Sequence, residues 1–221
     1  MTCTFFKKTL AGRVLQAIIG LFCYAMGVYL TLQANIGLGP WEVLAMGIAG
    51  KLGLIFGNAT LLVSAAILTM DVLMKERIGI GTVLNTIICS KAVDLYGWLE
   101  LVPKQENNLV ASIALMVAGM FTIAVGQLIY ISSALGCGPR DSFVVGVGKR
   151  LSRWPIGLVQ NSVLMIALLI GWLLGGPVGL GTLLSVVGLG ATMQLVFRIA
   201  KFEPRKVVHE GFFESFRKLK K

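Results

Sequence analysis

Two acidic residues occupy matching places within the apolar part of this chain. Glu42 ends the segment Gly-Leu-Gly-Pro-Trp-Glu, and Asp141 ends the segment Gly-Cys-Gly-Pro-Arg-Asp, 99 residues further on. A carboxylate in apolar surroundings can bind a cation or carry a proton, because so costly a charge is usually kept for a function. The second segment has Arg140 where the first has Trp41, and a guanidinium there could bind an anionic group instead. The pattern predicts a charged site for a small solute or ion.

The same residues also have purely structural interpretations. An acidic residue in the first turn of a helix is stabilised by the helix dipole, which alone would explain Glu42 and Asp141. Arg140 could be an arginine at the inner membrane surface, where Lys and Arg accumulate. Both interpretations stay open from the sequence.

Each acidic residue follows a Gly-x-Gly-Pro turn. Glycine lets the backbone turn without side-chain clashes, and proline at the first helical position loses no needed hydrogen bond. A helix can therefore begin abruptly, with free N–H groups and a partial positive charge at its start. The segments that follow, 40–53 and 139–151, are too short to span a membrane, and we expect half-helices dipping into it. The turn residues are Gly37, Gly39, Pro40, Gly136, Gly138 and Pro139.

A second element is also duplicated. Gly-Ile-Gly-Thr-Val-Leu-Asn at 79–85 returns as Gly-Leu-Gly-Thr-Leu-Leu-Ser at 179–185. Its hydroxyl and amide groups could contact a solute, although in membrane helices such groups more commonly hold neighbouring helices together. Together with the charged residues they form the candidate substrate-binding set, which is Glu42, Arg140, Asp141, Thr82, Asn85 and Thr182.

Lys91 and Asp94 lie three residues apart in an apolar run. We expect them to form an ion pair, because an isolated charge at membrane depth is costly. The pair could be a structural polar layer or a coupling site. His209 is the only histidine, and the four cysteines show no CxxC spacing. We therefore expect no enzyme activity, no cofactor and no metal site.

Composition places the chain among integral membrane proteins. Hydrophobic residues make up 56% of its 221 residues and charged residues 14%, and its mean hydropathy is +0.84. The net charge of +10 could suggest nucleic acid, but the basic residues flank apolar runs or lie near the C-terminus. Membrane orientation explains this pattern better, and no nucleic-acid partner is expected.

The glycine pattern indicates an internal duplication. The offset is 99 residues for Gly20 and Gly119 and becomes 100 for Gly81 and Gly181, so that one inserted residue relates two similar halves. Such colinear repetition is typical of membrane proteins built from two copies of one unit.

Six apolar segments are long enough to cross the bilayer: 12–34, 58–75, 80–100, 109–133, 157–174 and 181–200. Three crossings per half give the halves opposite orientations, so the expected fold is an all-α polytopic protein with inverted repeats. Eight crossings in two parallel halves are the alternative, which the charge distribution does not exclude but segment length disfavours. The expected parts are a cytoplasmic N-terminus, two membrane repeats and a basic amphipathic cytoplasmic tail, at 1–11, 12–104, 105–201 and 202–221.

The two duplicated motifs, together with Gly-Pro-x-Gly-x-Gly-Thr at 176–182, resemble the YczE-like membrane proteins of the bacterial YczE/YyaS/YitT group. The resemblance covers nearly the whole chain except the tail, and Glu42 stands where the group often has Asp. It implies a multi-pass protein of the bacterial inner membrane with both termini cytoplasmic. It implies no substrate.

The leading functional hypothesis is a transporter or channel-like protein whose small solute binds near the membrane midplane, between the two half-helices. An organic anion is weakly preferred, because Arg140 and two helix starts converge there. The alternative is a non-transporting scaffold or accessory factor for a membrane-associated partner. Besides the bilayer and a small-molecule or ion solute, a second copy of the chain is a conceivable partner, since the 27 glycines allow close helix contacts.

Overall fold

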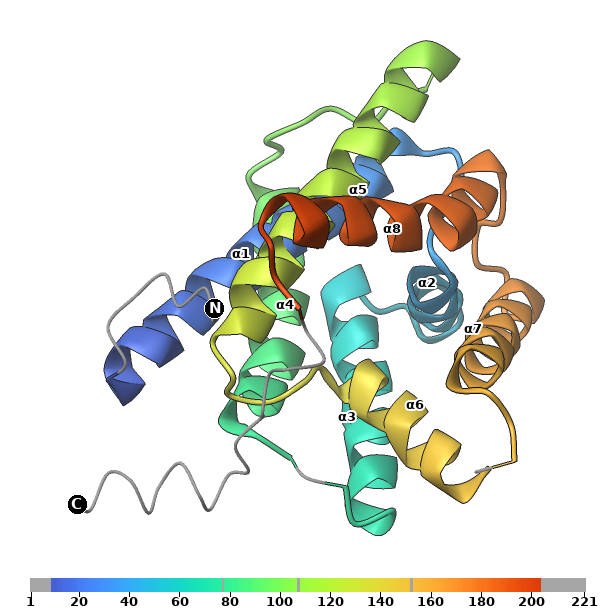
Figure 1. Cartoon of the computed structure of the whole chain (residues 1–221). Helices are drawn as coiled ribbons and strands as arrows, with labels where there is room; N and C mark the ends of the chain where they lie inside the picture. Colours follow the sequence, from blue (N-terminus) through green and yellow to red (C-terminus); the bar gives the residue numbers. More distant parts are fainter. Residues whose placement is uncertain (1–8, 77, 107, 152, 204–221) are drawn as a thin grey trace.

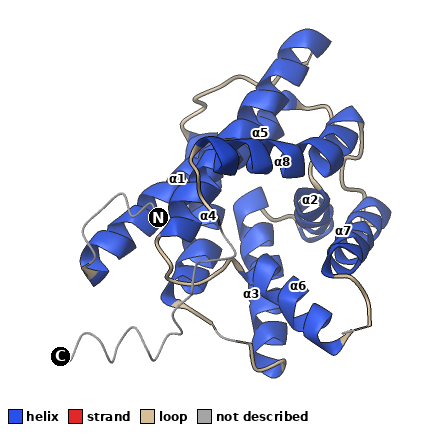
Figure 2. Ribbon diagram, viewed as in Figure 1, coloured by secondary structure: helices blue, strands red, loops and turns tan. Residues whose placement is uncertain are grey.

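The computed structural model of the chain describes residues 9–76, 78–106, 108–151 and 153–203 (Figure 1). Helices and loops, and no strands, make up these ranges (Figure 2). The predicted tail lies outside the described residues except for its first two. The helices are α1 Leu10–Ala34, α2 Pro40–Leu52, α3 Phe56–Leu73, α4 Ile80–Trp98, α5 Leu109–Ser132, α6 Pro139–Arg150, α7 Ile156–Leu173 and α8 Leu180–Ile199. The all-α prediction is confirmed.

Helix length separates two kinds of element. α2 and α6 have 13 and 12 residues, which at 1.5 Å per residue is about 20 Å or less, against a hydrocarbon core of about 30 Å. Five others, α1, α3, α5, α7 and α8, are long and apolar enough to cross a membrane. α4 has 19 residues but does not reach the same apolarity. The predicted boundaries agree with the observed ones to within two residues.

The two longest helices, α1 and α5, form the tightest packing in the molecule. A Cβ atom added to Gly20 would lie 2.6 Å from the backbone nitrogen of Tyr130, and Gly27 meets the backbone of Gly119 in the same way. Backbones approach this closely only where side chains are absent. Since position 20 meets 126 to 130 while position 27 meets 119 to 123, the two helices run antiparallel.

Each Gly-x-Gly-Pro turn docks on the other half of the chain. Gly37 has φ +107° and Gly136 has φ +132°, a region that glycine adopts without strain. The turn at Gly37 lies against the start of α8, where Gly181 N donates to Ile36 O at 2.7 Å. The turn at 136 lies against the start of α4, where the corresponding bond from the nitrogen of residue 81 to Leu135 O is 2.8 Å long. The starts of α2 and α6 are thereby fixed.

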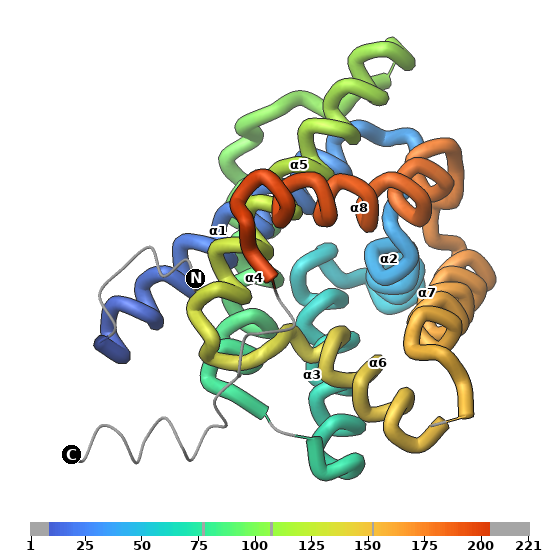
Figure 3. Tube along the Cα trace, in the orientation of Figure 1, coloured from blue at the N-terminus to red at the C-terminus, as the bar shows by residue number. Residues whose placement is uncertain are grey.

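The remaining helices are arranged around this frame in matching contacts (Figure 3). α4 packs on α1 as α8 packs on α5, and α7 packs on α2 as α3 packs on α6. Contacts of α2 with α3 likewise correspond to contacts of α6 with α7. The starts of the two short helices consequently lie inside the molecule, surrounded by the longer ones.

Replacing either turn glycine by alanine should destabilise the protein. A residue with a side chain at position 37 or 136 would have to adopt an unfavourable left-handed backbone conformation, which costs about 1–3 kcal/mol. In addition, a Cβ atom would lie 2.6 Å from the facing backbone at Gly37 and 2.9 Å from it at Gly136. Thermal unfolding in detergent would measure the loss. Gly97→Ala is the control, because no atom lies within 4 Å of its added Cβ. Equal unfolding temperatures for Gly37→Ala and Gly97→Ala would contradict the docking argument.

Candidate functional site

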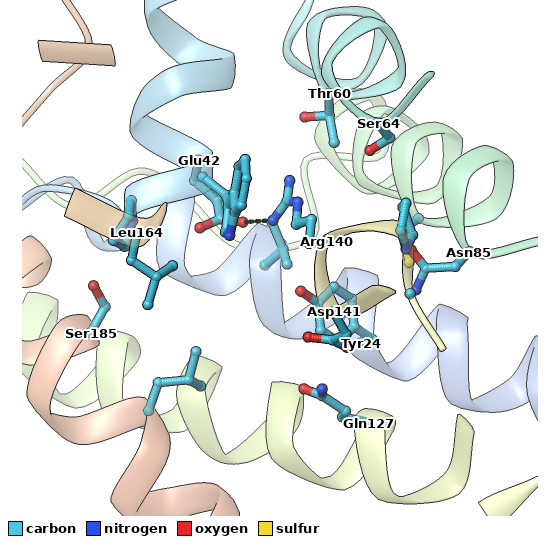
Figure 4. A pocket seen from close by; sticks show the side chains of 18 of the residues that line it. Tyr24, Glu42, Thr60, Ser64, Asn85, Gln127, Arg140, Asp141, Leu164 and Ser185 are labelled. Atoms are coloured by element: carbon cyan, nitrogen blue, oxygen red, sulfur yellow. Dashed lines mark hydrogen bonds and ion pairs between the residues drawn. The ribbon is translucent and has the colours of Figure 1, made fainter. Parts of the chain in front are cut away.

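A cavity of about 350 Å³ lies where the starts of α2 and α6 meet (Figure 4). All eight helices contribute to its wall. The turn residues Gly39, Pro40, Gly138 and Pro139 line it, whereas Gly37 and Gly136 face the opposite half. The volume is that of a small-ligand site.

Glu42 and Arg140 form an ion pair across the cavity, with 2.7 Å between Arg140 Nη1 and Glu42 Oε1. Their side chains are 15% and 18% exposed. The guanidinium carbon of Arg140 also lies 5.3 Å from the centre of the Trp41 ring, within reach of a cation–π interaction. Trp41 and Arg140, which occupy equivalent positions in the two repeated segments, therefore contact each other, and the charge of Arg140 is already neutralised by Glu42 of the first half.

Asp141 lines the same cavity in the first turn of α6 and is exposed. Because it points into the cavity (Figure 4), the cavity accounts for this exposure. Among the hydrogen bonds and ion pairs of the described residues, none involves its carboxylate. Neither Asp141 nor Glu42 accepts a capping hydrogen bond from the backbone, so hydrogen-bonded capping does not explain the pair.

Of the uncharged residues in the candidate set, Asn85 lies in the cavity wall and the two threonines lie outside it. Asn85 lines the cavity, whereas Thr82 and Thr182, 0% and 3% exposed, do not. Thr82 Oγ1 donates to Cys137 O at 2.6 Å and accepts a hydrogen bond from Gly79 N. Thr182 Oγ1 accepts a hydrogen bond from the nitrogen of residue 179 in the same manner. Thr82 thus binds the docked turn at Cys137, and Thr182 caps the start of α8.

The predicted pair of Lys91 and Asp94 is not formed. Lys91 Nζ donates to Asn58 Oδ1 at 2.6 Å, and Asp94 Oδ1 accepts from Gly57 N at 2.7 Å. The first turn of α3 has backbone N–H groups without partners inside the helix. The carboxylate of Asp94 binds one of these groups instead of Lys91 on its own helix. Both residues lie outside the cavity wall, and they join α4 to α3.

Several residues that the sequence reasoning missed also belong to the site. Gln127 and Tyr130 line the cavity from α5, and their spacing of three within an apolar helix was the available signal. Tyr130 is 3% exposed and its hydroxyl has no hydrogen-bond partner. Asp71 was also missed: it is fully buried on α3 with no hydrogen-bond partner for either carboxylate oxygen, although it does not line the cavity.

The apolar helices, with charged and polar side chains gathered in an internal cavity, define a polytopic helical membrane protein. Residues 11–198 match DUF6198, a family of unknown function, and the chain belongs to this family. It is 31% identical over 174 residues to an uncharacterised protein of Haemophilus influenzae, covering 79% of this chain and 78% of that one.

Two relatives from Bacillus subtilis, each 28% identical, confirm the family resemblance. The uncharacterised membrane protein YczE aligns over 190 residues, 85% of this chain and 86% of its own. The uncharacterised protein YyaS aligns over 183 residues, 81% and 89%. No solved structure matches the chain.

A double-mutant cycle should reveal strong coupling between Glu42 and Arg140. Glu42→Gln and Arg140→Met each leave a largely buried charge without its partner, costing about 1–3 kcal/mol, while the double variant should lose less than their sum, with a coupling of about 0.5–3 kcal/mol. Denaturant unfolding in detergent measures the free energies. The comparison cycle is Glu76→Gln with Lys149→Met, an ion pair whose glutamate is 9% and whose lysine is 63% exposed, for which a smaller coupling is expected because water screens the lysine charge. Additive effects in the first cycle would contradict the structural role of the pair.

Proposed function

We propose that this protein is an inverted-repeat transporter or channel-like protein of the bacterial inner membrane, whose small solute binds in the cavity between α2 and α6. The observation that carries the proposal is that matched positions of the two halves form one polar cavity. Asn85 and Ser185 line it, as do Glu42 and Asp141. Transporters with repeated halves typically bind solute at such an interface, near the ends of broken helices.

The contacts between helices support the inverted arrangement. The first helices of the two halves, α1 and α5, pack antiparallel, as two units of opposite orientation require. The reciprocal docking of the turns at Gly37 and Gly136 has the same two-fold relation. Eight crossings in parallel halves would require α1 and α5 to run in the same direction.

Charge distribution supports cytoplasmic termini. With six crossings, Lys75 and the basic residues at 149 to 153 lie on the inner side together with both termini, and only Lys51 and Lys104 face outward. This is the distribution that the positive-inside rule expects.

The argument for an organic anion as the solute no longer applies. It assumed a free guanidinium at Arg140, whereas that group is paired with Glu42. The unpaired group of the cavity is Asp141, and the geometry therefore favours the opposite sign of charge.

A scaffold or accessory role is the second candidate, and one observation favours it. In α7 and in α8, only 17% of the apolar 18-residue stretch is buried inside the molecule, whereas in α1 the buried share is 50%. Lipid can cover these faces, but so can the helices of a partner or of a second copy. Copurification of a stable partner in the absence of solute flux would favour this role.

Cysteine accessibility tests the orientation. Single cysteines at Lys51 and Lys75, both exposed, would be placed in a variant without the native cysteines and labelled in intact cells with an impermeant maleimide. We expect labelling at 51 and not at 75, because one crossing, α3, separates them. Labelling at 75 and not at 51 would exclude this orientation and support the parallel arrangement.

Solute flux tests the cavity. Purified protein in liposomes would be assayed electrically with a panel of small organic cations, carboxylates and inorganic ions. Glu42→Gln and Asp141→Asn should lower the transported current by roughly tenfold, since a hydrogen bond to a charged group contributes about 1.5–3 kcal/mol. Glu106→Gln, an exposed residue of the loop before α5, is the matched control. Unchanged current in both cavity variants would refute the assignment of the site.

A further inference from the structure

We infer that the cavity binds a small organic cation of the ammonium type, with Asp141 as its counter-ion. The inference rests on the proposal that the cavity is the solute site, and it names the class of solute. It follows from the charge, the aromatic lining and the polar groups of the cavity wall.

The charge of the wall is negative. Its charged side chains are Glu42, Arg140 and Asp141, and the first two neutralise each other at 2.7 Å. The carboxylate of Asp141 has no salt-bridge partner among the residues that the structure describes. The residue lies in the first turn of α6, at the end where the two short helices meet. A cationic solute would supply the missing partner.

Aromatic side chains line the same cavity as this carboxylate. Tyr24, Phe56 and Tyr130 line the cavity together with Trp41, whose ring is already occupied by Arg140. Aromatic rings attract cations through their negative faces, and alkylammonium groups are the ligands that this combination of rings and carboxylate suits best. A carboxylate solute would meet the same charge as its own in Asp141.

Two residues of the cavity wall, Thr60 and Tyr130, have a buried hydroxyl without a hydrogen-bond partner in the described part of the chain. Tyr130 lines the cavity, and its buried hydroxyl accepts or donates no hydrogen bond among the described residues. A buried hydroxyl without a partner costs free energy. An ammonium N–H could donate to this oxygen while its charge faces Asp141, which would satisfy both groups.

The wall of the cavity differs between the two halves. On α3 and α4 it includes Ser64, Cys89 and Ser90, which are buried, whereas on α7 and α8 it includes Gln160 and Val186, which are exposed. These more exposed residues of the wall carry no charge, so a cation beside them would meet no repulsion.

Binding to the full-length protein in detergent tests this inference without requiring transport. Calorimetric titrations would use tetramethylammonium chloride, methylammonium chloride and sodium acetate at constant ionic strength with sodium chloride. We expect both ammonium ions to bind and acetate not to bind. Asp141→Asn should weaken ammonium binding by roughly tenfold or more, while Glu106→Gln leaves it unchanged.

Tyr130→Phe provides a second variant that keeps the ring and removes only the hydroxyl. It should weaken methylammonium, which has N–H donors, several-fold, and leave tetramethylammonium, which has none, unaffected. This pattern stays informative even if Asp141→Asn fails to fold.

The outcomes separate this inference from the proposed function. Ammonium binding without flux would support the cationic site and refute transport. Flux of another solute without ammonium binding would refute the cationic site and keep transport. Acetate binding, equal ammonium affinity in Asp141→Asn, or no binding of any probe would each overturn the inference.

Discussion

The docking of each glycine turn on the opposite half is the constraint on which the rest of the structure depends. Gly37 and Gly136 bring the backbone into contact with the starts of α8 and α4, and one backbone hydrogen bond closes each contact. Neither half can form this contact by itself, because the backbone N–H group that donates to each turn belongs to the other half. The glycine contacts between α1 and α5 then follow from the same geometry, since these helices lead directly into the turns. Backbone contacts of this kind fix positions more narrowly than side-chain packing does, because a backbone has no rotamers to adjust.

The fixed positions of the two turns determine which charged side chains contact each other in the cavity. The proline after each turn starts a helix at once, so Glu42 and Arg140 are presented to each other from opposite sides of one cavity. Their pairing uses the only cation of the cavity wall and leaves Asp141 as the unmatched charge. Two nearly identical elements thus give an asymmetric site, and the asymmetry comes from a single pair of equivalent positions, 41 and 140. In such a site the backbone of the two halves stays symmetric, while the unpaired charge comes from one half.

Helix boundaries and the two short helices could be predicted from the sequence because they depend on local properties, namely run length and the glycine and proline of the turns. The cavity residues were predicted less completely. Thr82 and Asn85 lie three positions apart on one helix, yet the first holds a turn and the second lines the cavity, a difference that only the position of the other half decides. The Lys91–Asp94 pair was predicted from spacing along one helix, but α3 offered nearer partners. Interactions between distant segments are beyond what periodicity in one sequence can show.

The polar groups of α4 have a consequence for how the protein enters the bilayer. Alone, this helix is the least suited of the six longer ones to hydrocarbon, and its polar side chains depend on other helices: Lys91 and Asp94 on the start of α3, and the hydroxyl of Tyr96 on Phe22 O of α1. A nascent α4 released by itself would bring an unmatched ammonium and carboxylate into the lipid. Insertion together with α3 as a helical hairpin avoids this, since the partners of both charges arrive with them. The contacts of α4 therefore favour its insertion together with α3 over insertion as a single segment.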